Sequence, residues 1–111
     1  VDVVAQKYFW TFEYEGGNVT SRGKLVLPKD ETVYLTITSV DWLHAFHVPE
    51  MGLKQDAVPG ESHVLRTTPT TTGEFQGYCA EYCGAGHSGM LFEVEVMNES
   101  AYRDWLDDQR S

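Results

Sequence analysis

The stretch Thr32-Val-Tyr-Leu-Thr-Ile-Thr38 alternates aliphatic and hydroxyl-bearing side chains along its length. Its aliphatic residues recur at every second position, and most of its members are β-branched or aromatic, which favours the pleated surface of a sheet. A period of two places one set of side chains on a buried face and the other set towards solvent. The stretch therefore predicts a half-buried β-strand.

Segments with the same character lie on both sides of this stretch. We expect strands at residues 1–14, 24–27, 41–48, 62–67, 74–78 and 91–97. Turns are expected at residues 15–18 and 68–73, and residues 49–60, with their Met-Gly and Pro-Gly breaks, are expected to form an ordered loop. Many short strands at near-regular spacing predict an all-β sandwich or barrel.

The chain changes character after its last expected strand. Asn98 or Ser100 can cap a short helix, because either side chain can accept a hydrogen bond from a free amide of the first turn. The apolar face of that helix would be formed by Ala101, Tyr102, Trp105 and Leu106. With 111 residues and no repeat or linker, the chain is expected to form a single domain over residues 1–111.

The chain is acidic, with 17 aspartate and glutamate residues against 8 lysine and arginine residues, and a net charge of −9. No basic patch is visible in the sequence, so nucleic-acid binding is disfavoured. The charge indicates either a solvated surface or a docking face for a cationic partner, to which Asp41 and Glu13 are candidate contributors. No apolar run approaches the roughly 20 residues that cross a bilayer, so we expect a soluble fragment whose parent carries any membrane anchor outside it.

The strongest chemical signal is the segment Cys79-Ala-Glu-Tyr-Cys-Gly-Ala-Gly-His-Ser-Gly-Met90. It brings two thiols, an imidazole and a thioether into twelve residues. Thiolates and thioethers favour copper(I), and imidazole suits both copper states. A mononuclear blue-copper site uses one cysteine, two histidines and a weak axial methionine. Because two thiolates on one loop can each bridge two metals, the second cysteine indicates two coppers.

Other interpretations of the cysteines stay open. Cys79 and Cys83 could form a buried pair or a disulfide, although so small a loop removes little entropy from the unfolded chain. Two cysteines and two histidines could also hold zinc, but zinc leaves Met90 without a role. The candidates for an upstream histidine that completes the site are His44, His47 and His63.

The run Ser39-Val-Asp-Trp-Leu-His44, the segment at residues 48–60 and the cysteine segment closely resemble the copper domain of cytochrome c oxidase subunit II. The aromatic opening at residues 8–14 is similar to the first strand of that domain, so the resemblance covers nearly the whole chain. It implies a cupredoxin-like Greek-key β-sandwich that holds a dinuclear copper centre, called CuA.

The resemblance also implies a ligand at each matching position. These positions are His44, Cys79, Cys83, His87, Met90 and the backbone carbonyl of Glu81. The two cysteines would bridge the two coppers, and in the family the side chain at the Glu81 position can face a magnesium ion shared with subunit I. His47 lies three residues after His44, so alternation directs it to the opposite face of the strand. We therefore leave His47 and His63 out of the site.

Electron entry is the point at which the chain departs from the family. A leading tryptophan helps electron entry from cytochrome c in much of the family, and Tyr8 stands at that position here. Tyr8 and Trp10 are the candidates for electron entry, although tryptophans such as Trp10 more often belong to the core. Met51 and Met97 have no ligand neighbours and are expected to fill gaps in the core or an interface.

The resemblance implies that this domain accepts single electrons from cytochrome c and passes them to haem in subunit I of the oxidase. The domain itself would only transfer electrons, while oxygen reduction would take place elsewhere in the complex. Its place would be the outer face of an energy-transducing membrane, on the periplasmic side in bacteria or in the intermembrane space of mitochondria. Two rivals are the copper domain of a nitrous oxide reductase, which shares the ligand set, and a copper carrier or assembly protein that binds a single copper(I).

Overall fold

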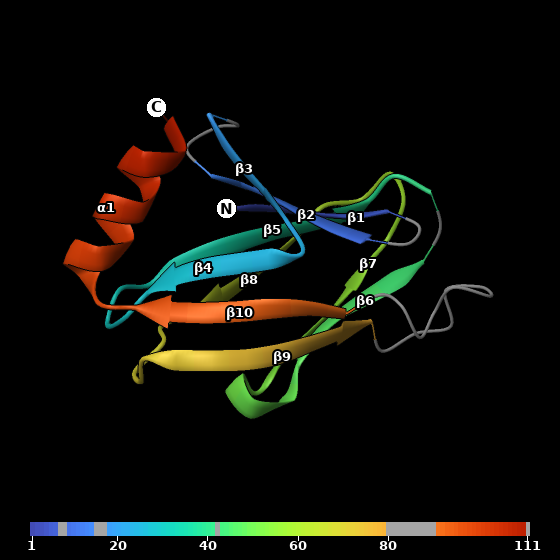
Figure 1. The fold of residues 1–111 in the computed structure, drawn as a ribbon. Coiled ribbons are helices and arrows are strands. Elements are labelled where there is room, and N and C mark those ends of the chain that lie inside the picture. The colour runs from blue at the N-terminus through green and yellow to red at the C-terminus, as the bar shows by residue number, and fades with distance from the viewer. Residues whose placement is uncertain (7–8, 15–17, 42, 80–90, 111) are drawn as a thin grey trace.

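The computed structural model of the chain describes residues 1–6, 9–14, 18–41, 43–79 and 91–110. These residues form two stacked β-sheets with a helix at the C-terminal end (Figure 1). The strands of the first sheet are β3 (Val19–Arg22), β2 (Phe9–Tyr14), β1 (Asp2–Gln6), β5 (Val33–Ser39) and β8 (His63–Thr67), in spatial order. Those of the second sheet are β4 (Lys24–Pro28), β10 (Leu91–Met97), β9 (Gly73–Cys79), β6 (His44–Val48) and β7 (Leu53–Ala57).

Both sheets mix parallel and antiparallel pairs. β1 runs antiparallel to β2 and parallel to β5, and β10 runs antiparallel to β9 and parallel to β4. Neighbours in a sheet are therefore often distant in the sequence, and the chain crosses between the sheets several times. This arrangement confirms the predicted all-β sandwich with a C-terminal helix. Among the residues described, no helix is both long and apolar enough to span a membrane.

Some predicted elements were wrong in their extent. The strand expected at residues 1–14 is a hairpin of β1 and β2, in which Ala5 lies opposite Trp10. The division into two strands was not visible in the sequence, because neither glycine nor proline lies between them. The loop expected at residues 49–60 contains a short 3-10 helix, η2 (Pro49–Met51), and the whole of β7. β3 was not expected, and the strand expected from residue 41 begins only at His44.

An aromatic cluster fills the space between the two sheets. Phe92 of β10 stacks on Phe46 of β6 with ring centroids 5.1 Å apart, and it also meets Trp10 at 5.3 Å and Phe12 at 5.5 Å. All four side chains are almost completely buried. Aromatic pairs at such distances contribute about 0.5–1.5 kcal/mol each beyond the area that they bury. The cluster therefore ties strands of both sheets together.

The C-terminal helix α1 (Glu99–Arg110) packs on β3 and β4 at the edge of the sandwich. Asn98 caps it, because its side-chain oxygen accepts a hydrogen bond of 2.9 Å from the backbone amide of Ala101. Trp105 meets the ring of Tyr14 edge to face at 5.1 Å. The hydroxyl of Tyr14 in turn accepts a hydrogen bond from the amide of Val26, and burial raises the pKa of Tyr14 above its usual value. The predicted cap and apolar face are confirmed.

Gly77 is required by the packing of the aromatic cluster. A Cβ at this position would lie 2.1 Å from Cε2 of Phe92, far inside the contact distance of two carbon atoms. Gly77 lies opposite Phe92 in the β9–β10 pair, so the ring of Phe92 lies over its bare backbone. The absence of a side chain at residue 77 thus lets the aromatic cluster reach β9, two residues before Cys79.

We expect Gly77→Ala to lower the free energy of unfolding by about 1–3 kcal/mol, as is typical of overpacked cores. Urea denaturation of the copper-free chain measures the loss. Phe92→Leu in the same background removes the obstructing ring, so the double variant should lose less stability than the sum of the two single losses. Strict additivity of the two losses would show that the ring and the new methyl group do not compete for space.

Candidate metal centre

Strands β6 and β9 bring two of the expected ligands together. These strands pair antiparallel with Phe46 opposite Cys79. His44 lies two residues before Phe46 and therefore shares its inward face. Nδ1 of His44 lies 3.8 Å from Sγ of Cys79, and both residues are buried. The sheet thus places an imidazole nitrogen beside a sulfur atom at the end of the sandwich where β9 finishes and β6 begins.

The second ring nitrogen of His44 is also engaged. Nε2 lies 2.7 Å from Oδ1 of Asp41. Asp41 is itself positioned by Ser39, whose hydroxyl lies 3.3 Å from the same carboxylate oxygen and also accepts a hydrogen bond from the amide of Asp41. The imidazole is wholly inaccessible to solvent, whereas the carboxylate is 29% exposed. The orientation of the His44 ring is therefore fixed from the side opposite Cys79.

The other two histidine candidates lie elsewhere. His47 is opposite Tyr78 in the β6–β9 pair, and it is partly exposed where His44 is buried. His63 begins β8 in the other sheet and pairs with Glu61, with Nε2 and Oε1 3.0 Å apart. Among the described contacts, the one between a histidine ring and the sulfur of Cys79 is made by His44. His44 and His47 therefore lie on opposite faces of β6, as alternation along the strand predicts.

Trp10 lies beneath this pair. Its ring centroid is 6.3 Å from that of His44, in an edge-to-face arrangement, and its side chain is fully buried. No acceptor for its Nε1 is found within the described part of the chain. Buried donors are almost always paired in native proteins, so a water molecule or another acceptor is expected beside it. Because its ring contacts both Phe92 and His44, Trp10 connects the aromatic cluster to the histidine.

Comparison with known proteins places this geometry in a family. Residues 17–97 match the family described as cytochrome c oxidase subunit II, periplasmic domain. The chain belongs to this family. Over 106 residues it is 38% identical to cytochrome c oxidase subunit 2 of Synechocystis sp., an alignment that covers 96% of this chain and 32% of that protein. Over 86 residues it is 41% identical to the Cereibacter sphaeroides protein of the same name, covering 78% of this chain and 28% of that protein.

A solved structure supports the fold independently. The periplasmic domain of subunit II of cytochrome oxidase (CoxB) of Bradyrhizobium japonicum superposes with a TM-score of 0.91 at 23% identity, covering 98% of this chain and 91% of that one. The predicted cupredoxin-like fold and the predicted resemblance to subunit II are therefore confirmed. The chain spans about a third of the length of the curated subunit II relatives that it matches.

The remaining ligands expected for a subunit II domain lie outside the described residues. These are Glu81, Cys83, His87 and Met90. The electron-entry candidate Tyr8 also lies outside them. Tyr78 and Leu91 face each other across the β9–β10 pair, so the chain between these strands starts and finishes at the end of the sandwich that holds His44. Within the described residues, no three histidine, cysteine or acidic side chains come together as a metal site.

The described atoms fit the copper centre that the family implies. A metal bound to nitrogen at about 2.0 Å and to sulfur at about 2.3 Å, with tetrahedral angles, holds those atoms about 3.5 Å apart. The observed 3.8 Å between Nδ1 of His44 and Sγ of Cys79 is close to that value. The pair is buried and chemically soft, which suits copper. His44 and Cys79 could thus share one ion with little rearrangement.

Cys79 is disulfide-bonded in this structure. The chain has one other cysteine, Cys83, which lies outside the described residues. A disulfide at Cys79 is the oxidised form of its thiol, in which the sulfur is not a thiolate. It does not conflict with copper binding, because reduction of a disulfide yields the thiolates that the metal needs.

Apolar side chains are exposed around the ligand positions of this subunit II domain. Tyr78 and Leu91 are 42% and 49% exposed, and Val40 and Leu43 flank Asp41 with 60% and 42% exposure. All four lie within three residues of an expected ligand or of Asp41. Of these, Tyr78 and Leu91 lie directly opposite each other in the β9–β10 pair, and large exposed apolar side chains that lie together are typical of surfaces that bind a partner.

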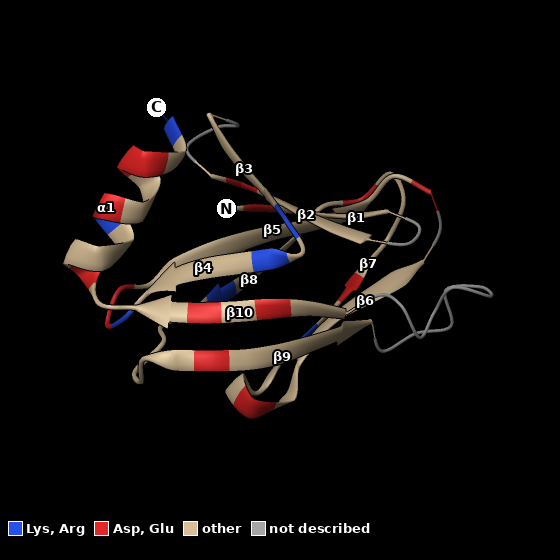
Figure 2. Cartoon of the chain, viewed as in Figure 1, with Lys and Arg blue, Asp and Glu red and all other residues tan. Residues whose placement is uncertain are grey.

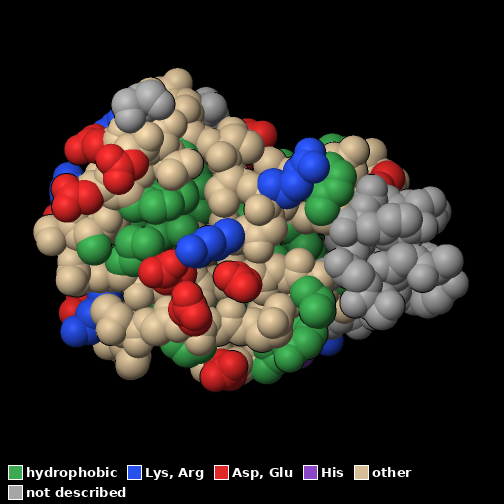
Figure 3. All heavy atoms as spheres, viewed as in Figure 1, with side chains coloured by type: hydrophobic (Ala, Val, Ile, Leu, Met, Phe, Trp, Pro, Cys, Tyr) green, Lys and Arg blue, Asp and Glu red, His purple; other side chains and the backbone are tan. Residues whose placement is uncertain are grey.

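Acidic side chains lie on the outer face of the second sheet, on the strands β9 and β10, where Figure 2 shows red segments. Glu93 and Glu95 of β10 alternate with inward residues, and Glu95 lies opposite Glu74 of β9. Lys24 of β4 meets them, with its Nζ 2.6 Å from Oε1 of Glu95. That hydrogen bond raises the pKa of Lys24, and the neighbouring glutamates add to the effect. Figure 3 shows this group of acidic side chains around one basic residue on the surface.

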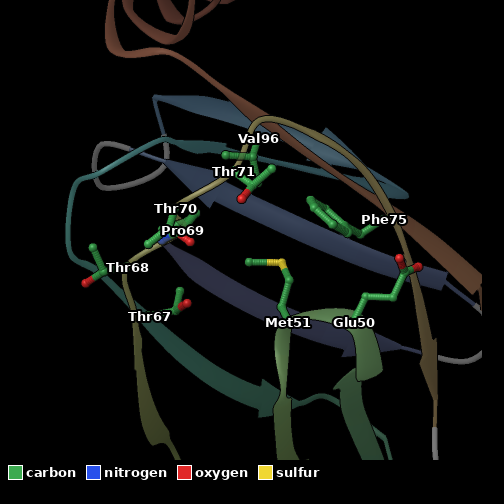
Figure 4. Close-up of a pocket in the computed structure, with 9 residues that line it drawn as sticks. All are labelled: Glu50, Met51, Thr67, Thr68, Pro69, Thr70, Thr71, Phe75 and Val96. Carbon is green, nitrogen blue, oxygen red and sulfur yellow. The ribbon is translucent and has the colours of Figure 1, made fainter.

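A pocket of about 330 Å³ lies away from the candidate metal centre. It opens between η2 and the connection from β8 to β9, towards the end of the sandwich where β9 begins (Figure 4). The side chain of Met51 extends into it, opposite threonines of that connection. Met51 is also packed against the core, as the sequence predicted, and neither His44 nor Cys79, the two expected ligands among the described residues, lines this pocket.

We expect His44→Ala to abolish the visible absorption that appears when copper is added to the reduced chain, because the variant lacks a buried ligand at the centre. His47→Ala and His63→Ala should retain that absorption, since their side chains lie elsewhere on the sandwich. Optical titration of the three variants with copper makes the comparison. If His47→Ala lost as much absorption as His44→Ala, the assignment of His44 as the ligand would be wrong.

Proposed function

We propose that this chain is the CuA domain of a cytochrome c oxidase subunit II and transfers single electrons. The observation that carries the proposal is the buried contact of 3.8 Å between Nδ1 of His44 and Sγ of Cys79. In a member of the subunit II family, whose sequence carries Cys83, His87 and Met90 at the remaining ligand positions, that contact supports a shared copper centre.

The proposed ligands divide between two parts of the chain. His44 is supplied by β6, and the others are supplied by the end of β9 and the chain that follows it, with Cys79 and Cys83 as bridges and the carbonyl of Glu81 as a further ligand. When bound, the two copper ions held by these residues would supply a redox centre that takes up and gives up one electron at a time.

The contribution of the chain is to keep its ligands in place and to exclude water. His44 is held by Asp41 on one side, and its ring packs against Trp10 on another. Cys79 ends a strand that pairs with both β6 and β10, above a closely packed aromatic cluster. Packed interiors resist displacement, so neither ligand can move far when the charge of the centre changes. Resistance of this kind lowers the reorganisation that opposes electron transfer.

Electron entry is proposed to involve the aromatic residues near the centre. Trp10 is buried, so it cannot meet a donor protein at the surface, but its ring lies 6.3 Å from the ring of His44. It is suited to act as an internal relay, with Tyr8 as the candidate that meets the donor. The exposed apolar residues Tyr78 and Leu91 offer the donor a second route of approach beside Cys79.

The partners proposed for the whole protein follow from family membership. They are a cytochrome c or an equivalent donor, and subunit I of the oxidase, which would carry the haem and reduce oxygen. The proposed place is the outer face of an energy-transducing membrane, which the periplasmic description of the family supports. A magnesium ion at the interface with subunit I through Glu81 stays a prediction.

Membership in the subunit II family favours this function over the two rivals. A nitrous oxide reductase domain would share the ligands, but the family match is to subunit II. A carrier of a single copper(I) would not need two bridging cysteines with two histidines and a thioether. The number of coppers separates the carrier from the electron-transfer domain directly.

We expect the reduced chain to bind about two coppers, which share one unpaired electron in the oxidised, mixed-valence state. Metal analysis gives the number, and electron paramagnetic resonance shows whether the electron couples to two copper nuclei. Cys79→Ser should abolish the shared state while leaving one copper, whereas Met90→Leu should mainly change the reduction potential, because a thioether is a weak axial ligand. One copper per wild-type chain, with coupling to a single nucleus, would exclude the dinuclear centre.

We expect the rate at which cytochrome c reduces the copper-loaded chain to fall steeply as salt is raised. Charge steering can accelerate association about ten- to a thousandfold, and salt screens it within about 10 Å at 0.1 M. Stopped-flow absorbance over a salt series measures the rate, with electron transfer within the docked pair as an internal control that should barely respond. A flat or rising rate would favour docking through the apolar residues instead.

A further inference from the structure

Asp41 and His44 form a pair whose geometry is more specific than a surface contact. Oδ1 of Asp41 lies 2.7 Å from Nε2 of His44, while Nδ1 of the same ring faces Sγ of Cys79 at 3.8 Å. The ring is completely buried. The carboxylate therefore lies beside one ring nitrogen and the sulfur atom beside the other, and the ring has no access to solvent.

This arrangement selects one form of the imidazole. A neutral imidazole carries its hydrogen on one nitrogen and a lone pair on the other. A carboxylate at hydrogen-bonding distance only accepts, so it stabilises the form in which Nε2 carries the hydrogen. The lone pair then lies on Nδ1, which is the nitrogen that faces Cys79. A carboxylate that holds the second nitrogen of a metal-binding histidine fixes the ring and makes it a stronger ligand.

The carboxylate is itself held in place. Ser39 is 5% exposed, and its Oγ lies 3.3 Å from Oδ1 of Asp41 and accepts from the Asp41 amide at the same distance. These contacts keep Asp41 at the turn between β5 and β6 rather than free to turn into solvent. A held carboxylate orients the ring without the entropy loss that a mobile side chain would incur.

We propose that Asp41 is a positioning residue for the copper centre, which keeps the hydrogen of His44 on Nε2 and so presents Nδ1 to the metal. This inference rests on the proposed function and adds to it. Asp41 was a docking candidate in the sequence because of its charge alone. The structure gives its carboxylate a partner inside the protein, so its removal would affect the centre even when no donor protein is present.

The chain offers a matched control. Glu61 and His63 form a second carboxylate–imidazole pair, with Oε1 and Nε2 3.0 Å apart. This pair is exposed and lies on the first sheet, and His63 is not an expected ligand. Glu61→Gln therefore removes the same charge from the same kind of pair without approaching Cys79.

The first measurement needs no metal. In the reduced, copper-free chain, nitrogen-15 chemical shifts of the imidazoles report which nitrogen carries the hydrogen. Wild-type His44 should carry it on Nε2, and Asp41→Asn and Asp41→Ala should shift part of the population to Nδ1, while Glu61→Gln leaves His44 unchanged. Asp41→Asn keeps the size of the side chain, and urea unfolding confirms that each variant folds.

The second measurement uses copper alone. Copper affinity should fall about ten- to a hundredfold in both Asp41 variants, as is usual when the partner of a metal-binding histidine is removed, and the reduction potential should change. Glu61→Gln should match the wild type in both. Unchanged His44 shifts together with wild-type affinity and potential in Asp41→Asn would overturn the proposal. If the wild-type reduced chain bound no copper, the proposed function would fail, while the nitrogen-15 shifts would still decide the role of Asp41.

Discussion

The antiparallel register of β6 with β9 is the constraint on which the candidate centre depends. It places Cys79 opposite Phe46 and therefore brings His44, two residues earlier, to the same inward face. A slip of one residue would send every side chain of one strand to the other face of the sheet. His47 would then turn inward and His44 outward. The aromatic cluster opposes that slip, because Phe46 would also have to leave its stack with Phe92.

The same cluster links the rigidity of the fold to the proposed chemistry. Phe92 lies over Gly77, packs against Trp10 and stacks on Phe46, and Trp10 in turn meets His44. A displacement of either ligand strand therefore disturbs contacts in the other sheet. The proposed electron transfer would benefit from ligands that move little when the charge changes, and the packing of the core limits such movement.

Sequence reasoning reached the architecture, and it predicted His44 among the histidines, because both inferences depend on local patterns. The alternation of Val33, Leu35 and Ile37 is visible without any partner strand, and the step of three from His44 to His47 separates their faces. The division of residues 1–14 into β1 and β2 was missed because no glycine or proline lies between the two strands, and β7 was missed because its middle residues, Lys54 to Asp56, are polar. The contact between Asp41 and His44 could not be found from charge alone, since it depends on where the Asp41 carboxylate lies relative to the ring.

The position of β10 determines when the second sheet can form during synthesis of the chain. β10 hydrogen-bonds to both β4 and β9, so these two strands lack their shared neighbour until residues 91–97 have been synthesised. During synthesis the second sheet therefore remains divided, with β4 on one side and β9, β6 and β7 on the other. Phe92, the centre of the aromatic cluster, belongs to β10 and is therefore synthesised at the same stage. Domains generally fold as units once their chain is available, so a metal centre built on this sheet is completed only after β10 has been made.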